Sequence, residues 1–300
     1  MTSEITLFVN PTAGRGRGAH AAQPAASALR DAGFSVRTVL GEDADDALRR
    51  ARAAVAGGTG ALIAVGGDGM MSLALQAVAG TTTPLGVVAV GTGNDFARAL
   101  GLPIRDPAAA GRLAAEALKD GAVREIDLGR VGERWFGSVL ASGFDSRVND
   151  RGNRMRWVGG RFKYDLAILA ELAAFKPIPY RIGLDGGPVR EIEATLVAVG
   201  NGTTYGGGMR ICADAVMDDG LFDVTIVGDC SRTTLIKVFP RVYKGTHLGH
   251  PKVTVHRVSS IELAAAGVTA YADGEQLGVL PLTAHCVPGA VRVLVPGPPA

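Results

Sequence analysis

The sequence predicts an α/β N-terminal domain with a doubly wound, mostly parallel sheet, followed by an antiparallel β-sandwich domain. The first observation is that short β-branched apolar runs alternate with alanine-rich stretches over about the first 120 residues. The second is that β-rich runs separated by Gly, Asn and Asp turns follow from about Arg124 onward. We therefore expect a first domain over residues 1–124 and a second over residues 125–290, and the last strand, near residues 291–300, fits either domain.

The first domain is predicted to be a βαβ series, in which each apolar run is a strand and each alanine-rich stretch a helix. Runs such as ALIAV and GVVAV are apolar throughout, which is typical of parallel strands that helices cover on both faces. Ligands bind beyond the carboxyl ends of such strands, where this chain places polar, glycine-rich loops. The expected strands are 5–9, 36–40, 61–65 and 85–90, and the expected helices are 19–32, 43–56 and 70–79.

The second domain is predicted to be antiparallel because its apolar runs are short and are bounded by turn residues. Two longer stretches without such punctuation are expected to be helical insertions. The expected strands are 135–140, 179–184, 192–199, 222–227, 252–263, 268–271 and 291–295, and the expected helices are 161–175 and 231–244.

Composition limits the class of protein. With 300 residues, 47% of them hydrophobic, and a formal net charge of +2, the chain fits packed globular domains and carries no excess positive charge for nucleic acid. The three cysteines, Cys212, Cys230 and Cys286, are odd in number and widely spaced, which argues against a disulfide framework or a zinc site and favours a cytoplasmic protein. The N-terminal apolar run follows Glu4 and is too short for a signal peptide, and no stretch has the roughly 18 apolar residues of a membrane helix. We therefore expect no export and only peripheral membrane contact.

The clearest motif is Gly66-Gly67-Asp68-Gly69, which follows a predicted strand and precedes a predicted helix. Residues without a Cβ atom bring backbone N–H groups close to an anion at the positive N-terminus of a helix, so this loop suits phosphate. A bare carboxylate repels phosphate, and a Mg²⁺ ion or a water molecule at Asp68 resolves that conflict. The alternative is a tight turn in which Asp68 caps a helix.

Two further loops end predicted strands on the same rim of the sheet. The segment 10–18, NPTAGRGRG, matches neither GxxxxGK[ST] nor GxGxxG with a distal acid, so it predicts neither a Walker ATPase nor a nicotinamide dehydrogenase. Its arginines Arg15 and Arg17 suit a polyphosphate, although ordinary surface arginines explain them as well. The segment 91–96, GTGNDF, offers a hydroxyl and a carboxamide to a ligand, or is simply a capped helix start.

Oxygen-rich segments also occur in the second half. The sequence ADGE at residues 272–275 predicts a β-turn between apolar strands, and on its own it places Glu275 as a solvent-facing residue of a type I′ or II′ hairpin. The segment 201–223 combines three consecutive glycines with four aspartates, a composition that suits Mg²⁺ or Ca²⁺ but also solvated turns.

Two other patterns carry weaker alternatives. His247 and His250 offer two metal ligands without a third, so metal-dependent hydrolysis is disfavoured. The segment 151–163 mixes five cations with Met155, Trp157 and Phe162, as a membrane-surface element does, and a solvated helix and loop fits it equally well.

Five motifs, in this order, resemble the diacylglycerol kinase catalytic family. They are NPTAG at residues 10–14, GGDG at 66–69, GTGNDFAR at 91–98, the GGG-containing segment that ends in DDGLFD at 206–223, and DGE at 273–275. The resemblance runs from about Ile5 to Leu280 and is to the bacterial soluble lipid kinases of the family. It implies an ATP-binding α/β domain, a β-sandwich domain for the lipid substrate, and an active-site cleft between them.

The resemblance also implies roles for individual residues. Glu275 is implied as the proton acceptor. Asp68 is implied as a second catalytic residue. A catalytic Mg²⁺ is implied at Asp68, Asp95 and Asp127, through water. A structural Mg²⁺ is implied at the carboxylate of Asp219 and the backbone carbonyls of Val216 and Leu221. The residues implied around ATP are Asn10, Pro11, Thr12, Ala13, Gly14, Thr38, Gly66, Gly67, Asp68, Gly69, Met70, Met71, Ser72, Thr92 and Asn94.

Two positions depart from the family pattern. Met70 stands where the family usually has threonine, which removes a hydroxyl that can touch phosphate, and Ser72 nearby does not clearly replace it. Ala213 stands where many relatives have proline, which relaxes a loop beside the implied structural metal. We expect neither change to abolish activity.

The resemblance therefore implies an ATP- and Mg²⁺-dependent kinase of phospholipid biosynthesis. The expected substrate is diacylglycerol, converted to phosphatidic acid by a cytoplasmic enzyme that associates transiently with the membrane surface. Other acceptors stay open: a sphingoid base, phosphatidylglycerol or NAD, the last disfavoured because GTGNDFAR and DGE follow the lipid kinases. A protein of a different class, an inactive nucleotide-binding regulator, also stays open as an alternative. No nucleic acid partner is expected, and the oligomeric state, including a homodimer, is left open.

Overall fold

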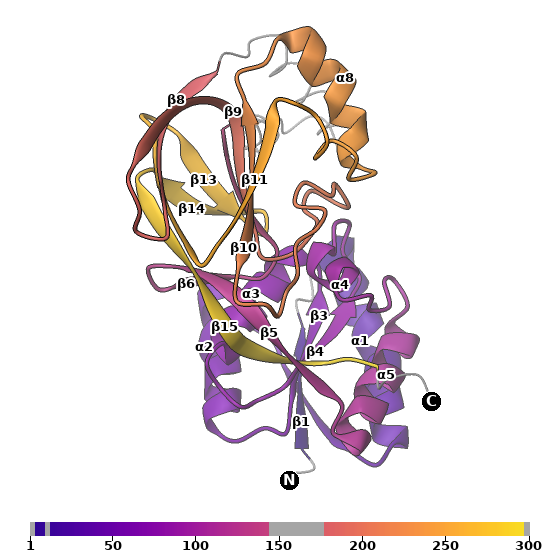
Figure 1. Cartoon of the computed structure of the whole chain (residues 1–300). Helices are drawn as coiled ribbons and strands as arrows, with labels where there is room; N and C mark the ends of the chain where they lie inside the picture. The colour runs from indigo at the N-terminus through magenta and orange to yellow at the C-terminus, as the bar shows by residue number, and fades with distance from the viewer. Residues whose placement is uncertain (1–3, 10–12, 144–176, 297–300) are drawn as a thin grey trace. The chain divides into compact units, whose positions relative to one another are not determined.

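The computed structural model describes residues 4–9, 13–143 and 177–296 (Figure 1). The chain divides into two compact units. Unit 1 comprises Met1–Leu128, Met217–Asp219 and Val287–Ala300, and unit 2 comprises Gly129–Val216 and Gly220–Cys286. The predicted order, an α/β unit before a β-rich unit, is confirmed.

Unit 1 has a parallel sheet in the order β15-β4-β3-β1-β2. Its strands are β1 (Glu4–Val9), β2 (Ser35–Val39), β3 (Leu62–Gly66), β4 (Leu85–Ala89) and the end of β15 (Leu282–Leu294), which joins β4 through Val293 and Leu85. Every residue of β3 and β4 is buried, as the continuous apolar runs predict for strands covered on both faces.

Helices cover both faces of this sheet (Figure 1). They are α1 (Ala13–Asp31), α2 (Ala44–Ala56), α3 (Asp68–Val78), α4 (Asp95–Ala99) and α5 (Pro107–Asp120). Helix α1 packs on α5, and α2 packs on α3. The predicted set lacks α5, although Asp106 caps it by accepting a hydrogen bond from the Ala109 amide at 2.9 Å and Gly121 ends it in the left-handed conformation.

Unit 2 is an antiparallel sheet in the order β14-β13-β7-β9-β8-β12-β15, with β10 paired to β9 and β11 paired to β10. One apolar cluster contains Tyr180, Val197 and Phe222, and a second contains Leu196, Val227 and Leu235. The strands are β6 (Arg134–Phe136), β7 (Val139–Gly143), β8 (Ile178–Leu184), β9 (Arg190–Gly200), β10 (Phe222–Gly228), β11 (Val253–Val258), β12 (Ser260–Ala264), β13 (Thr269–Ala272) and β14 (Glu275–Val279).

The remaining elements are β5 and α8. Strand β5 (Val123–Val131) pairs with β15 and β6, and helix α8 (Arg232–Val242) contributes Leu235 and Val242 to the second apolar cluster. The predicted helix over 161–175 lies outside the described residues. In the described part of the chain, no helix is long and apolar enough to cross a membrane.

Two predicted strands are each two strands in the structure, so their predicted bounds are wrong. The run 135–140 is interrupted because the Gly137 and Ser138 amides donate to the Asp273 carboxylate at 2.7 and 2.8 Å. The run 252–263 is interrupted because the Ser259 and Ser260 amides both donate to Asp185 at 2.8 Å. In both places a distant carboxylate replaces the ladder partner of the backbone amides.

Candidate active site

Asp68 links two of the glycine-rich loops. It begins α3, yet its carboxylate makes no cap for that helix, whose N-cap Gly67 has no side-chain hydrogen bond. Instead, one carboxylate oxygen accepts from the Asn94 amide and the other from the Asp95 amide, each at 3.0 Å. Asp68 therefore caps α4, a helix that begins 27 residues further along the chain.

The two loops also approach each other closely, which explains their glycines. A Cβ atom on Gly91 would lie 2.5 Å from the Cα atom of Gly67, and one on Gly93 would overlap the Asp68 carboxylate. The motifs GGDG and GTGND therefore form one surface, and a side chain at either glycine would separate them.

Asn94 closes the second loop on itself. It adopts the left-handed conformation, with φ of 57°, and is buried. Its carboxamide oxygen accepts from the Gly91 amide at 2.9 Å, and its Nδ2 donates to the Gly91 carbonyl at 3.0 Å. The carboxamide that the sequence assigns to the nucleotide thus stabilises its own loop, and the role of Asn94 toward the nucleotide stays a prediction.

The start of α3 suits an anion. The first amides of α3 that donate hydrogen bonds within the helix are those of Met70 and Met71, both to the Gly67 carbonyl. The amides of Asp68 and Gly69 come before these bonds, at the end of the helix that favours an anion. The side chains of Met70, Met71 and Ser72 are buried in unit 1. Methionine in place of the family threonine therefore fills the core here.

The other rim residues are distributed as follows. Gly66 ends β3, Thr92 is exposed in the loop before α4, and Ala13 and Gly14 begin α1. Asn10, Pro11 and Thr12 lie outside the described residues, as does the cationic segment 151–163.

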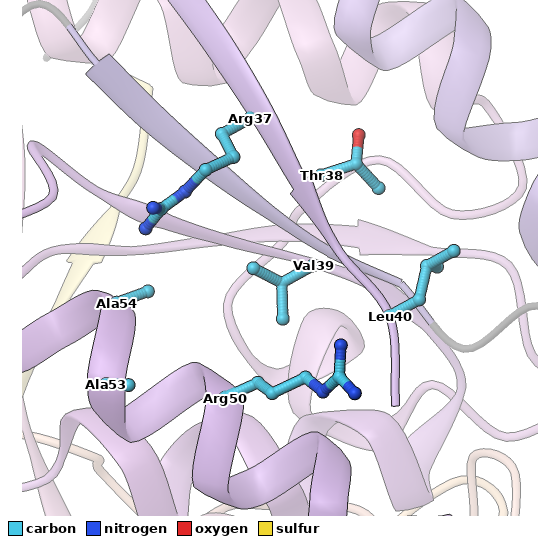
Figure 2. A pocket seen from close by; sticks show the side chains of 7 residues that line it. All are labelled: Arg37, Thr38, Val39, Leu40, Arg50, Ala53 and Ala54. Atoms are coloured by element: carbon cyan, nitrogen blue, oxygen red, sulfur yellow. The ribbon is translucent and has the colours of Figure 1, made fainter. Parts of the chain in front are cut away.

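Thr38 lies at a hollow of about 430 Å³ along β2 and α2, shown in Figure 2. Its size falls in the usual range of ligand pockets. Arg50 extends from α2 toward the end of β2 and pairs with Asp46 at 2.7 Å, while Arg37 pairs with Glu4 at 3.5 Å. The hollow thus has cationic side chains along its edge.

Asp127 and the segment Met217–Asp219 lie together in unit 1. The amide of Asp127 donates to the Met217 carbonyl at 2.7 Å, and the Arg124 guanidinium pairs with Asp218 at 2.8 Å. The Asp127 carboxylate is buried and accepts from the Gly289 amide at 2.8 Å. This segment is therefore held against β5.

The donor atoms of the implied metal sites fit Mg²⁺ in kind. Asp219 is exposed, and its carboxylate lies next to the turn at Gly220, whose φ is 76°. The other implied ligands are the backbone carbonyls of Val216 and Leu221, which are hard oxygen donors. No group of three His, Cys, Asp or Glu side chains converges within the described ranges, so any such site depends on backbone carbonyls and water. The metal roles of Asp68, Asp95, Asp127 and Asp219 stay predictions.

Glu275 begins β14 and is exposed, next to the turn at Asp273 and Gly274. These two residues have φ of 51° and 85°, the left-handed pair of a type I′ hairpin, as the sequence predicts. Asp273 is bonded to Gly137 and Ser138, and the Asn201 Nδ2 donates to the Gly137 carbonyl at 2.9 Å. The turn that carries Glu275 is therefore anchored by buried loops.

Neither Asp273 nor Asn201 is predicted as a site residue from the sequence pattern. The sequence around Asp273 shows an Asp-Gly pair between two predicted strands. This pair predicts the turn, but it does not predict that Asp273 binds the amides of Gly137 and Ser138. The weaker hydrolase alternative gains nothing from the structure: His247 Nε2 bonds the Ile211 carbonyl at 3.0 Å, and His250 Nδ1 accepts from the Lys252 amide at 3.2 Å.

Comparison with known proteins identifies the family. The profile of the diacylglycerol kinase catalytic domain matches residues 4–131, and that of the YegS C-terminal NAD kinase beta sandwich-like domain matches residues 138–295. A diacylglycerol kinase of Mycobacterium tuberculosis is 44% identical over 298 residues, which are 98% of this chain and 95% of the relative. A protein of Xanthomonas euvesicatoria pv. vesicatoria named "Probable lipid kinase YegS-like" is 32% identical, over 91% of both chains.

Solved structures share the fold. A crystal structure of a diacylglycerol kinase from Bacillus anthracis superposes with a TM-score of 0.73 at 22% identity, covering 98% of this chain and 97% of the other. An NAD kinase from Archaeoglobus fulgidus in complex with ATP gives 0.54 at 14% identity, covering 97% and 93%. The sequence matches and the two profiles together show that the chain belongs to the diacylglycerol kinase catalytic family.

Proposed function

We propose that this protein is an ATP-dependent lipid kinase that converts diacylglycerol to phosphatidic acid for phospholipid biosynthesis. The observation that carries the proposal is the junction at Asp68, which joins the GGDG and GTGND loops into one surface within the matched catalytic domain. Phosphoryl transfer depends mainly on positioning and on neutralising charge; such a surface supplies the positioning, and its backbone amides together with Mg²⁺ would neutralise the phosphate charge.

The nucleotide is assigned to unit 1. Amides at the start of α3 bind phosphate oxygens, and the hollow beside Thr38 receives the other end of ATP. When bound, Mg²⁺ would neutralise charge on the phosphates, and Asp68, Asp95 and Asp127 would hold it through water.

Glu275 is assigned as the general base. It takes the proton of the lipid hydroxyl while that oxygen bonds to the γ-phosphorus, and the bond from the γ-phosphorus to the bridging oxygen breaks, so that ADP leaves with both electrons. General base catalysis of this kind contributes about 10² to 10⁴ in rate. An exposed carboxylate on an anchored turn is suited to meet a bulky acceptor.

Diacylglycerol resides in bilayers, so the enzyme must reach a membrane surface from the aqueous phase. A peripheral, transient association is the mode that fits a chain whose described helices do not cross a bilayer. An NAD kinase activity is the second candidate, since an NAD kinase shares the fold, but the two relatives described above, at 44% and 32% identity, carry lipid kinase names.

The experiment is a transfer assay with γ-labelled ATP and a panel of acceptors: diacylglycerol, monoacylglycerol, sphingosine, ceramide, phosphatidylglycerol and NAD. The proposal expects label on diacylglycerol above all others. Label on NAD, or ATP binding without transfer to any acceptor, would replace it with a different kinase or with an inactive regulator.

A further inference from the structure

Helix α8 packs on unit 2 with one face only. Ser231 caps it, accepting from the Thr234 amide at 3.2 Å, and the buried side chains Leu235, Val238 and Val242 recur at the spacing of one helical face. Leu235 and Val242 join the apolar cluster of unit 2. Figure 1 shows the helix, in orange, on the outside of the strands of that unit.

A second face of α8, about 100° around the helix from the buried one, is apolar and partly exposed. Ile236 is 56% exposed and Tyr243 is 40% exposed. Phe239 lies between them and contacts Tyr243 edge to face, with ring centroids 6.1 Å apart. Residues 236, 239 and 243 share one helical face, so solvent meets a stripe of three apolar side chains in which Phe239 is half-buried.

Basic side chains share the exposed side of α8 with this stripe: Arg232 lies beside it, and Lys237, Arg241 and Lys244 form a second stripe farther around the helix. Arg232, Lys237, Arg241 and Lys244 are all exposed, and residues 230–261 contain no Asp or Glu. Arg241 donates to the Thr246 carbonyl at 2.8 Å, which leaves its charge unneutralised. Across the described ranges, none of the four cations makes an ion pair. The α8 face is defined here as Arg232, Ile236, Lys237, Arg241, Tyr243 and Lys244.

We propose that the α8 face is a docking surface for an anionic lipid bilayer, on which the helix lies parallel to the membrane. This inference rests on the proposed function. It adds to that function the surface by which the kinase contacts the bilayer that holds its lipid substrate. Aliphatic and aromatic side chains enter the interface while arginine and lysine reach the anionic headgroups, which is the chemistry of interfacial amphipathic helices.

The charge of the α8 face favours a bilayer over a second copy of the chain. A twofold contact through this face would place four cations against the same four cations, with no acid to separate them. Anionic lipids supply the missing negative charge. Each Lys or Arg near such a surface contributes about fivefold in affinity at moderate salt.

The test is sedimentation of the full-length protein with vesicles of phosphatidylcholine, with or without phosphatidylglycerol. Wild type is expected to bind the anionic vesicles, and to release as salt is raised. The double variant K237E/K244E should bind at least about 25-fold more weakly, from two lost cations. Ile236→Asp should also weaken binding, and Ile236→Leu should retain it. The matched control R112E/R190E makes the same charge change at two exposed arginines, one on α5 and one at the start of β9, and should bind like wild type.

Two results overturn the proposal. One is equal binding by K237E/K244E and by R112E/R190E. The other is a dimer in solution that K237E/K244E dissociates, because the face would then contact a second copy. Circular dichroism of each variant confirms that it is folded.

A separate assay distinguishes failure of docking from failure of the proposed function. With diacylglycerol in neutral detergent micelles, K237E/K244E should phosphorylate it at the wild-type rate while losing activity on anionic vesicles. A wild type that binds vesicles through α8 yet phosphorylates no lipid in micelles would support docking and contradict the kinase.

Discussion

The backbone amide of Asp95 donates a hydrogen bond of 3.0 Å to the carboxylate of Asp68, so two acids that the family resemblance places at one metal ion are also joined through the main chain. The adjacent Asn94 amide bonds the other oxygen of the same carboxylate. Asp68 therefore has a structural task, holding α4 against the GGDG loop, that any substitution there disturbs together with catalysis.

Asp68→Asn should lower both stability and turnover. An amide side chain accepts only one of the two loop hydrogen bonds and loses the negative charge, so the free energy of unfolding should fall by about 1–3 kcal/mol. Turnover should fall about 100-fold or more because the loops and the implied metal both lose their anchor. Urea unfolding and steady-state kinetics measure the two effects.

The matched control for Asp68 is Glu116→Gln, the same acid-to-amide change at an exposed position of α5. It should change neither quantity measurably. If Asp68→Asn unfolds at the wild-type urea concentration, the loop-anchoring role is wrong, whatever happens to turnover.

Asp273→Ala should slow turnover by releasing the turn that positions Glu275. Asp273 lies in the left-handed conformation and accepts from the Gly137 and Ser138 amides. Without its carboxylate the turn loses its anchor, and kcat should fall about 10- to 100-fold with a much smaller change in KM for ATP. Asp273→Asn, which retains one acceptor oxygen, should recover part of kcat.

Asp185→Ala is the control for Asp273. Asp185 has the same left-handed conformation, with φ of 49°, and likewise accepts from two backbone amides at a strand break, those of Ser259 and Ser260. The Asp185→Ala variant should be less stable than wild type but should show no selective loss of kcat. Equal kcat losses in the two variants would show that Asp273 acts only through the fold.

His247 should make stability depend on pH. Burial lowers its pKa, with a smaller push from Arg241, against opposing effects of the Ile211 carbonyl and Asp214. Because the folded pKa lies below the unfolded value of about 6.5, the unfolded chain binds more protons. Stability is therefore complete above about pH 6.5 and is lost as pH falls from there toward the folded pKa.

Urea unfolding at pH 7.5 and pH 5.5 measures this effect. The loss of unfolding free energy between these values should be smaller in His247→Gln, which retains a donor for the Ile211 carbonyl. His250→Gln, at a partly exposed ring, should lose as much as wild type. An identical pH dependence in His247→Gln and wild type would exclude His247 as its source.

The sequence predicted the elements that a local pattern of apolar residues determines. The strands β1 to β4 follow from short β-branched apolar runs, which are apolar throughout only in β3 and β4, and each predicted boundary lies within one residue of the observed one. The breaks at Gly137–Ser138 and Ser259–Ser260 depend on Asp273 and Asp185, which are 136 and 74 residues away, so no local pattern contains them.

The same distinction holds at the site. The position of residues 66–69 and 91–95 directly after two predicted parallel strands predicted that they share a rim, because the carboxyl ends of neighbouring parallel strands meet there. It did not predict that Asp68 caps α4, since the cap requires the fold to place the Asn94 amide within 3.0 Å of a carboxylate 26 residues earlier. Asp273 was overlooked for that reason too.

The most direct test of the central claim is transfer of label from γ-labelled ATP to diacylglycerol by wild type and by Glu275→Gln, with ATP binding measured alongside. We predict labelled phosphatidic acid with wild type, and in Glu275→Gln a rate about 10² to 10⁴ lower with unchanged ATP affinity, because only the proton acceptor is lost. Label on NAD in place of the lipid, or wild-type turnover in Glu275→Gln, would contradict the account.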